Sequence, residues 1–406
     1  MRKILQVGKK VLTDRFTHEE DGFMVRVSSI FSQILFLVDR VEFHKIAKKH
    51  DAEKHSKGYS CWEQFVAMLF CQLAQAKSIR EICGGLSCCT GKLKHLGFQD
   101  APNKSTLSYA NAHRPWTLYQ DLFYQMLERC RMGAPRHKFK FKNKLLSLDS
   151  STISLCLSLF PWAEYRRTKG AVKLHLLLDH DGYLPTYAYI SNGKRSDVKA
   201  ARLVPLTKGS IVAMDRGYND YRLFSDWIER GIFFVTRLKD NAVYFVEKNR
   251  GVPCNRNILA DQEIVLADYD KCPHTLRRIV VWDDTKEREI VLLTNHLTFG
   301  ATTISAIYKD RWQIELFFKA LKQNLKVKTF VGTSENALYI QIWTALIAML
   351  LIKYLQFMSK IAWSLSNLVA LLHWNLFIYR NLWEWINDPY QAPPLETDPS
   401  QLALLI

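Results

Sequence analysis

The stretch YKDRWQIELFFKALK, residues 308–322, has the polar and apolar periodicity of one helix. At about 100° per residue, four of its polar side chains fall within roughly 60° of one another. These four residues are Tyr308, Arg311, Glu315 and Lys322. Ile314, Phe317 and Leu321 point the opposite way, so the segment predicts a helix with one packed side and one polar side.

The polar side of this helix carries one carboxylate between two cations. Glu315 lies between Arg311 and Lys322, which suits a nucleic-acid phosphate held through a metal ion. A carboxylate alone would repel a phosphate, and Arg or Lys alone could not hold the metal. The alternative is an ordinary amphipathic surface helix with Glu and Lys on its wet side. The segment by itself leaves both interpretations open.

Two aspartates upstream follow apolar segments with strand character. Asp149 closes the apolar run in KLLSLDSSTISL, and Asp215 closes the one in GSIVAMDRGYND. An acid at a strand end is rigidly held and can emerge into a cleft. Asp215 lies 66 residues after Asp149, and Glu315 lies 100 residues after Asp215. For either Asp alone, a helix N-cap or a turn former is the alternative interpretation.

The contexts LDSST and DRGY and the spacing of Tyr, Arg, Glu and Lys resemble the signatures of transposases of the insertion sequence 4 family. The resemblance implies a catalytic triad of Asp149, Asp215 and Glu315. Three hard carboxylates favour Mg²⁺, so we expect the triad to hold two Mg²⁺ ions, with Mn²⁺ as an alternative. The residues expected to bind DNA phosphate are Tyr308, Arg311 and Lys322.

The same resemblance implies a cut-and-paste transposase. Such a protein binds the terminal inverted repeats of its element, cleaves DNA at the ends and joins them to target DNA, acting as a homodimer in a synaptic complex. Some relatives release the ends through a hairpin and hold a flipped base with an insertion-domain Trp. In this chain, Ile290 occupies the position just before VLLTN where such a Trp would be expected. Trp282 lies eight residues earlier, and Trp312 lies next to Arg311, so neither is assigned this role. Two alternatives stay open, a metal-dependent DNA nuclease without strand transfer and a non-catalytic DNA-binding regulator.

The charge of the chain agrees with a nucleic-acid partner. A formal net charge of +17 and a pI near 9.4 produce a field that attracts phosphate backbones. Residues 131–144, RMGAPRHKFKFKNK, hold six Lys or Arg and no acid. The alternation in KFKFK predicts a strand with one basic face, and a solvated linker is the alternative.

The order of patterns predicts an α/β fold with three regions. Residues 140–330 are expected to form a ribonuclease-H-like catalytic domain, because three antiparallel strands precede strands that alternate with helices. A β-rich insertion is expected at about 237–300. Residues 1–135 predict a helical N-terminal DNA-binding domain that folds alone, and residues 331–406 predict a helical C-terminal region.

Within the first region, SIREICGGL and NKSTLSYANAHR predict a helix-turn-helix unit. Its second helix carries Asn111 and Arg114, whose side-chain types are best able to read adenine and guanine edges. A short polar surface helix is the alternative.

Cysteine usage predicts a protein of the reducing cytoplasm, and the family resemblance implies a bacterial protein associated with the nucleoid. The nine cysteines include no CxxC pair and no Cys/His cluster with zinc spacing, so free thiols are expected. Residues 1–16 lack the apolar core of a signal peptide. Residues 339–358 approach the length of a membrane span, but Lys353 and two Gln interrupt them. We therefore expect a helix buried against the catalytic sheet and no membrane partner.

Overall fold

The computed structural model describes residues 28–54, 56, 58–166, 169–254, 257–327 and 329–390. Within these residues, helices fill the chain up to residue 133, strands dominate from 145 to 294, and helices return from 301. The expectation about a signal peptide falls on residues 1–16 and lies outside the described part.

The strands of the described chain form one sheet. Their bounds are β1 (Leu145–Leu155), β2 (Glu164–Arg166), β3 (Lys169–Asp179), β4 (Leu184–Asn192), β5 (Ile211–Met214), β6 (Phe233–Arg237), β7 (Tyr244–Asn249), β8 (Ile258–Leu266), β9 (Leu276–Asp283) and β10 (Arg288–Thr294). Within the described residues nine of the ten strands follow the order β2-β3-β1-β5-β6-β10-β9-β8-β7, and the tenth, β4, pairs with β3 off this path. The apolar runs before Asp149 and Asp215 are strands here, as predicted.

The centre of the sheet is mixed. β3 pairs antiparallel with β1 and with β4, and the hairpin between β3 and β4 turns through Gly182, whose φ is +70°. β5 runs parallel to β1 and to β6. Short β5 holds only Ile, Val, Ala and Met, all buried, as expected for a strand covered on both faces.

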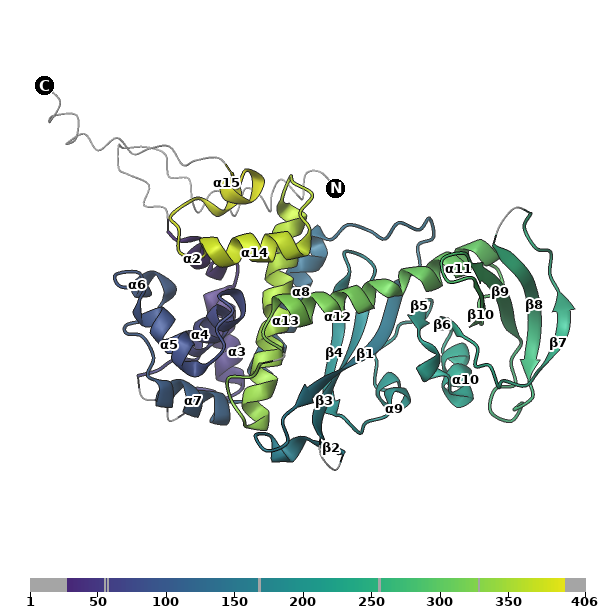
Figure 1. The fold of residues 1–406 in the computed structure, drawn as a ribbon, viewed down its shortest axis with the longest axis horizontal. Coiled ribbons are helices and arrows are strands. Elements are labelled where there is room, and N and C mark those ends of the chain that lie inside the picture. The colour runs from purple at the N-terminus through teal and green to yellow at the C-terminus, as the bar shows by residue number, and fades with distance from the viewer. Residues whose placement is uncertain are drawn as a thin grey trace, which may run out of the picture.

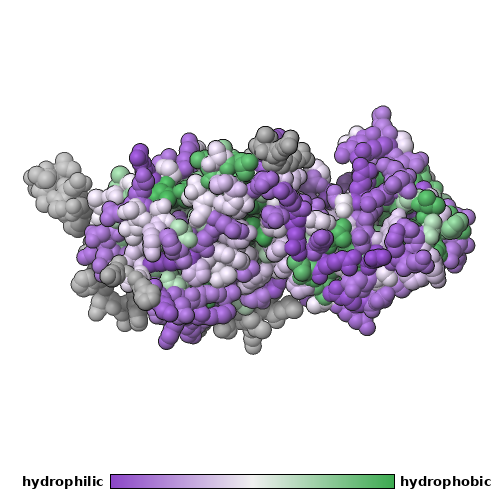
Figure 2. Space-filling view, turned by 90° about the horizontal axis from the view of Figure 1, so that it is seen from below, coloured by the Kyte–Doolittle hydropathy of each residue, from purple (hydrophilic) through white to green (hydrophobic). Residues whose placement is uncertain are grey.

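The β-rich segment after β6 extends the sheet instead of interrupting it. β10 pairs antiparallel with β6, and β9, β8 and β7 follow outward. Arg277 on β9 and Asp261 on β8 form a buried ion pair at 2.6 Å that fastens two of these strands. Figure 1 shows the four strands at one end of the molecule, and Figure 2 shows hydrophilic residues covering most of that end.

Helices surround the sheet and form a second body beside it. The described helices before the sheet are α2 (Ile30–Leu35), α3 (Arg40–Lys49), α4 (Cys61–Leu73), α5 (Ile79–Ser87), α6 (Leu93–Leu96), α7 (Lys104–His113) and α8 (Thr117–Gly133). Those within and after it are α9 (Asp197–Ala201), α10 (Tyr221–Glu229), α11 (Ala301–Asp310), α12 (Trp312–Asn324), α13 (Glu335–Met358), α14 (Leu365–Asn375) and α15 (Leu382–Asn387). The capping box of Ser60 and Glu63 at the start of α4 is one sequence signal that fixes such a helix end.

Helix α13 is the buried centre of the helical body. It is the one described helix long and apolar enough to cross a membrane, yet 83% of its most apolar window is buried inside the fold. It packs against α8, α4, α7 and α14, and it shares an apolar cluster with residues of β1, β3 and β4. Figure 1 shows it between the N-terminal helices and the sheet. α13 is therefore a core helix, although its main neighbours are helices and not the catalytic sheet as expected.

The N-terminal and C-terminal helices share this core. Every residue of α4 is buried. Gln72 on α4 donates to the backbone oxygen of Gln341 at 3.3 Å and accepts from the backbone of Lys326 at 2.8 Å. Phe31 donates through its backbone to Leu376 at 2.8 Å. This packing argues against the expectation that residues 1–135 fold alone.

The basic run before β1 does not form the strand expected from KFKFK. Residues 134–144 contain bends and no ladder, because no neighbouring strand pairs with them. The alternation of the side chains nevertheless persists. Phe139 and Phe141 stack at 5.3 Å between ring centroids and pack partly buried against the cluster under α11, while Lys140 and Lys142 are exposed.

Candidate active site

Asp149 and Asp215 lie at neighbouring positions of the sheet. The parallel ladder of β1 and β5 ends at the pair Leu148 and Met214, directly before the two acids. Because neighbouring strands are about 4.8 Å apart, the backbones of the two acids lie beside each other, and the charge of Asp215 acts on Asp149. Asp149 does not end its own strand as expected, since β1 continues along β3 to Leu155. What ends at this point is β5, which leaves one side of β1 open beside Asp149.

The turn after β5 holds the second candidate acid, Asp215, in place. Asp215 caps the short 3₁₀ turn Arg216–Tyr218, and its Oδ1 accepts a hydrogen bond from the backbone of Gly217 at 2.7 Å. A Cβ at position 217 would lie 2.9 Å from that oxygen, so only glycine permits this approach. Asp215 can therefore both form the turn and act as a candidate acid. Its Oδ1 accepts the hydrogen bond of the turn, and a ligand would be held through Oδ2.

The segment of Glu315 is two consecutive helices and not one. α11 ends at Asp310 and α12 begins at Trp312, while Arg311 between them keeps nearly helical angles, φ −51° and ψ −31°. Figure 1 shows both helices running across the sheet, and they pack on β5 and β6 and on β1, respectively. Asp310, the last residue of α11, accepts a 2.7 Å hydrogen bond from His180, which directly follows β3.

Arg311 stands between the first and the third candidate acid. Its Nη2 donates to Glu315 Oε1 at 2.6 Å, and its Nη1 lies 3.6 Å from Asp149 Oδ2. The side chain of Arg311 is 11% exposed, so this cation is held in the site and not in solvent. Among the described residues, no three acidic, His or Cys side chains are close enough to share one ion. In this conformation the guanidinium therefore occupies the space between the two carboxylates.

Tyr308 and Lys322 lie on the same side as Glu315, as the periodicity predicts. The ring of Tyr308 lies 5.7 Å from the guanidinium carbon of Arg311. Lys322 donates to the backbone oxygen of Thr152 on β1 at 3.1 Å. The residues expected on the packed side, Ile314, Phe317 and Leu321, are all buried. The packed side of this segment is therefore confirmed, whereas Tyr308 of the polar side is itself partly buried against the apolar cluster under α11.

Burial makes Asp149 a weaker acid than an ordinary Asp. Removal from water raises the pKa of Asp149 to about 7, and the charges of Asp215 and Glu315 add to this, although a backbone hydrogen bond from Ser150 and the charge of Arg311 oppose it. The three acids are thus close enough for their charges to matter to one another. A site that disfavours a further negative charge in this way is one that a bound cation would stabilise.

This raised pKa predicts a pH dependence of stability. In the metal-free protein, folded Asp149 keeps its proton up to about pH 7, whereas an unfolded Asp releases it near 3.8. Its contribution to stability is therefore largest at low pH and is lost as the pH rises from about 4 to about 7. We expect Asp149→Asn to be more stable than wild type in urea unfolding with EDTA, with the gap widening by roughly 2 kcal/mol between about pH 5.5 and about pH 8. An equal gap at both pH values would contradict the assignment.

The two residues expected to read DNA bases make their hydrogen bonds within the protein. Asn111 is 1% exposed, and its side chain accepts from Gln64 at 2.8 Å and donates to the sulfur of Met68. Arg114 is half-buried and donates to Ser60, Gln64, Ser56 and Tyr59. Asn111 sits on the inner face of α7, which the low amphipathicity of NKSTLSYANAHR did not indicate. As folded, neither side chain is presented to a base edge, and we do not propose either as a DNA reader.

The sequence interpretation missed Asp310, a buried acid beside the site. Asp310 is buried directly before Arg311, and its carboxylate is held by Lys138, His180 and Tyr183. The available signal was its position, because an acid in the last turn of a helix meets the negative end of the helix dipole and needs a compensating partner.

Comparison with known proteins places this chain in a family. A model of the transposase DDE domain matches residues 140–351, more than half of the chain, and this range contains all three candidate acids. The chain therefore belongs to the family of DDE-domain transposases, a class of enzymes that cleave and transfer DNA. Residues 26–99 match a domain of unknown function, DUF4372.

Individual relatives agree with the family. The chain is 30% identical over 259 residues to a probable transposase for insertion sequence element IS5377 of Geobacillus stearothermophilus, covering 63% of this chain and 68% of the relative. It is 29% identical over 288 residues to putative transposase y4zB of Sinorhizobium fredii, covering 70% and 80%. A solved piggyBac transposase synaptic complex with hairpin DNA is 10% identical, with a TM-score of 0.42 over 90% of this chain and 81% of that one.

Proposed function

We propose that this chain is the transposase of an insertion sequence, of the insertion sequence 4 type, which binds terminal inverted repeats, cleaves DNA at the element ends and transfers the ends to target DNA. The observation that carries the proposal is that the parallel ladder of β1 and β5 ends directly before Asp149 and Asp215, while Arg311 lies between Asp149 and Glu315. The order of antiparallel strands followed by parallel strands supports a ribonuclease-H-like core for residues 140–330.

The three acids fit a hard divalent cation in the chemistry of their donors. All are carboxylates, the pKa of Asp149 shows a site that resists further negative charge, and a guanidinium already occupies the space between two of them. Asp149, Asp215 and Glu315 would hold Mg²⁺ or Mn²⁺ once Arg311 has moved aside. The metal would supply an activated hydroxyl and stabilise the leaving oxygen of an in-line displacement at phosphorus, with two ions as the expected number.

The neighbouring residues have roles that do not depend on the metal. Arg311 would exchange Glu315 for a DNA phosphate, since its planar fork can bind two phosphate oxygens. Lys322 would neutralise phosphate charge as a compact cation beside β1. Tyr308 would hold the guanidinium in place through its ring and offer a hydroxyl to the DNA backbone. We propose that the DNA-bound form is a homodimer acting at the bacterial nucleoid.

Strand transfer separates this proposal from its nearest alternative. We expect the purified protein to join a pre-cut end of its own element to a supercoiled plasmid in Mg²⁺, because a DNA 3′-hydroxyl can replace water as the nucleophile at such a site. The measurement is the appearance of joined product on a gel. The control is an end with a 3′-deoxy terminus, which lacks the nucleophile. Cleavage without joining would favour the nuclease, and sequence-specific binding without either reaction would favour the non-catalytic regulator.

A further inference from the structure

A buried carboxylate lies directly beside the candidate active site without belonging to it. The side chain of Asp310, the last residue of α11, is 2% exposed. Its oxygens accept hydrogen bonds from Lys138 at 2.6 Å, from the ring of His180 at 2.7 Å and from the hydroxyl of Tyr183 at 3.3 Å. Burial alone would raise the pKa of Asp310, but the hydrogen bonds from His180 and Lys138 outweigh it and lower the pKa. The group is therefore a charged, fully bonded carboxylate.

The hydrogen bonds continue from Asp310 to the strand of the first acid. His180 is buried, and because a carboxylate only accepts, its Nδ1 donates to Asp310. Its Nε2 lies 2.7 Å from the hydroxyl of Ser147, which is 0% exposed. Ser147 lies on β1 two residues before Asp149 and faces the same side of the sheet. The path Asp310, His180 and Ser147 thus joins the helix end next to Arg311 to the strand that carries Asp149.

Such a network is a costly way to hold two elements together. A negative charge at the C-terminal end of a helix opposes the helix dipole, and taking an ion pair out of water costs several kcal/mol before its contacts repay it. Apolar side chains of α11, including Ile304 and Ile307, already fasten this helix to the sheet without this cost. The network adds directional precision, because hydrophobic contact has no preferred angle whereas a hydrogen bond does.

We propose that Asp310, with His180 and Ser147, is a positioning network for the active site. It fixes the junction of α11 and α12 against β1, and so sets where Arg311 and Glu315 stand relative to Asp149. The inference rests on the proposed function of the three acids, but it assigns no chemistry to Asp310 itself. Lys138 closes the network at the surface, which gives one residue of the basic run a structural task apart from DNA.

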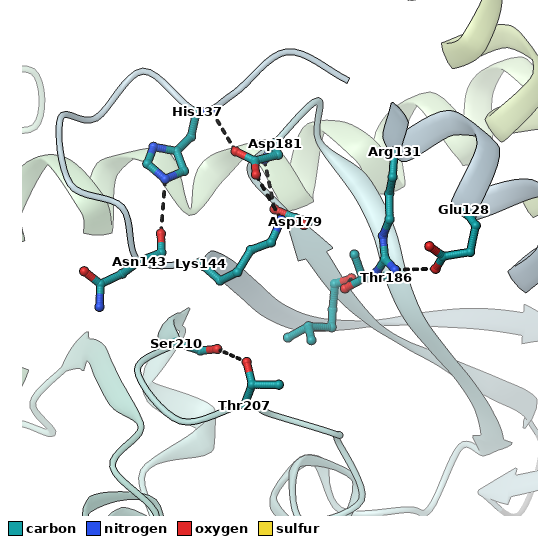
Figure 3. Close-up of polar contacts among 11 residues, drawn as sticks. Glu128, Arg131, His137, Asn143, Lys144, Asp179, Asp181, Thr186, Thr207 and Ser210 are labelled. Atoms are coloured by element: carbon teal, nitrogen blue, oxygen red, sulfur yellow. Dashed lines mark hydrogen bonds and ion pairs between the residues drawn. The ribbon is translucent and has the colours of Figure 1, made fainter. Parts of the chain in front are cut away.

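A neighbouring ion pair offers a matched control. Lys144 donates to Asp179 at 2.6 Å and to Asp181 at 2.9 Å, and Asp181 also accepts from the backbone of His137 at 2.8 Å, as Figure 3 shows. This pair joins the loop before β1 to the β3–β4 turn. It lies in the same region as Asp310 and has similar chemistry, but it holds no residue of α11 or α12. Asp181→Asn should therefore perturb stability without moving Glu315.

The test measures Mn²⁺ binding by the full-length protein, through the loss of the free Mn²⁺ signal in electron paramagnetic resonance. Groups that bond directly to metal ligands typically contribute about 10- to 100-fold to affinity. Asp310 bonds no proposed ligand and acts through the junction of α11 and α12. We therefore expect Asp310→Asn to weaken Mn²⁺ binding by about 10-fold, at the lower end of that range. Ser147→Ala should weaken it severalfold, and Asp181→Asn should leave it within about twofold. Thermal unfolding of each variant reports stability separately, and a purely structural role would lower the melting temperature without changing the affinity of the folded protein.

The outcomes distinguish this inference from the function on which it rests. If Glu315→Gln abolishes Mn²⁺ binding while Asp310→Asn and Ser147→Ala bind like wild type, the positioning network is overturned and the proposed function stands. If Glu315→Gln binds Mn²⁺ as tightly as wild type, the metal site itself is misassigned. Should Asp310→Asn fail to fold, Ser147→Ala decides, because it removes one hydrogen bond at the far end of the path and leaves the charge pair of Asp310 intact.

Discussion

Replacing Glu315 by Gln is expected to abolish DNA cleavage while leaving DNA binding within about twofold. The change keeps the volume of the side chain and its place on α12, but it removes one of the charges that would hold the metal. Several kcal/mol of transition-state stabilisation correspond to a fall in rate of at least about a thousandfold. Cleavage of a labelled element end measures the rate, and a mobility-shift assay measures binding. Asp149→Asn and Asp215→Asn are expected to behave in the same way.

Arg311→Ala is the control that separates metal binding from phosphate binding. This variant should also slow cleavage, because it lacks the guanidinium that would hold the phosphate. Its Mn²⁺ affinity should not fall and is expected to rise, since the guanidinium now bonded to Glu315 and close to Asp149 competes with a metal for the same oxygens. A Glu315→Gln variant with more than about a tenth of wild-type cleavage would remove that residue from the triad. An Arg311→Ala variant that loses Mn²⁺ binding would refute the competition.

Residues 1–135 expressed alone are expected not to fold. Helix α4 is buried on every side, and α13 from the distant end of the sequence supplies one of the surfaces that cover it. Without α13, the apolar residues of α4 would face water at roughly 25 cal/mol for each Å² exposed. Circular dichroism on heating should show no cooperative transition for the fragment, and a sharp one for the full chain. A cooperative transition with dispersed amide resonances would show an independent domain and would restore the sequence-based expectation.

Point variants of the full chain test the same packing. Trp343 on α13 is 1% exposed, and its ring lies 5.3 Å from that of Phe123 on α8. Trp343→Ala should lower the free energy of unfolding by roughly 3–5 kcal/mol. The matched control is Trp374→Ala on α14, where a side chain 75% exposed should change it by no more than about 0.5 kcal/mol. Similar effects at both positions would argue against α13 as the shared core.

Local patterns predicted most of the secondary structure because each depends on near neighbours in the chain. The alternating run before Asp149 predicted β1, and the four-residue apolar run before Asp215 predicted β5. The same reasoning failed for KFKFK, where the alternation is present but no partner strand is. A strand needs hydrogen bonds from another segment, and nothing within KFKFK reveals whether one will be adjacent.

Local spacing was enough to predict the polar side of the Glu315 segment, because spacing along a helix fixes which side chains share a face. The folded chain was needed to show that Arg311 stands between Asp149 and Glu315, that Asp310 is tied to β1 through His180, and that α13 is shared by both ends of the chain. These three features depend on contacts between segments that are far apart in the sequence, or on burial that changes the free energy of a charged side chain. The periodicity of a single segment carries no information on distant contacts or on burial.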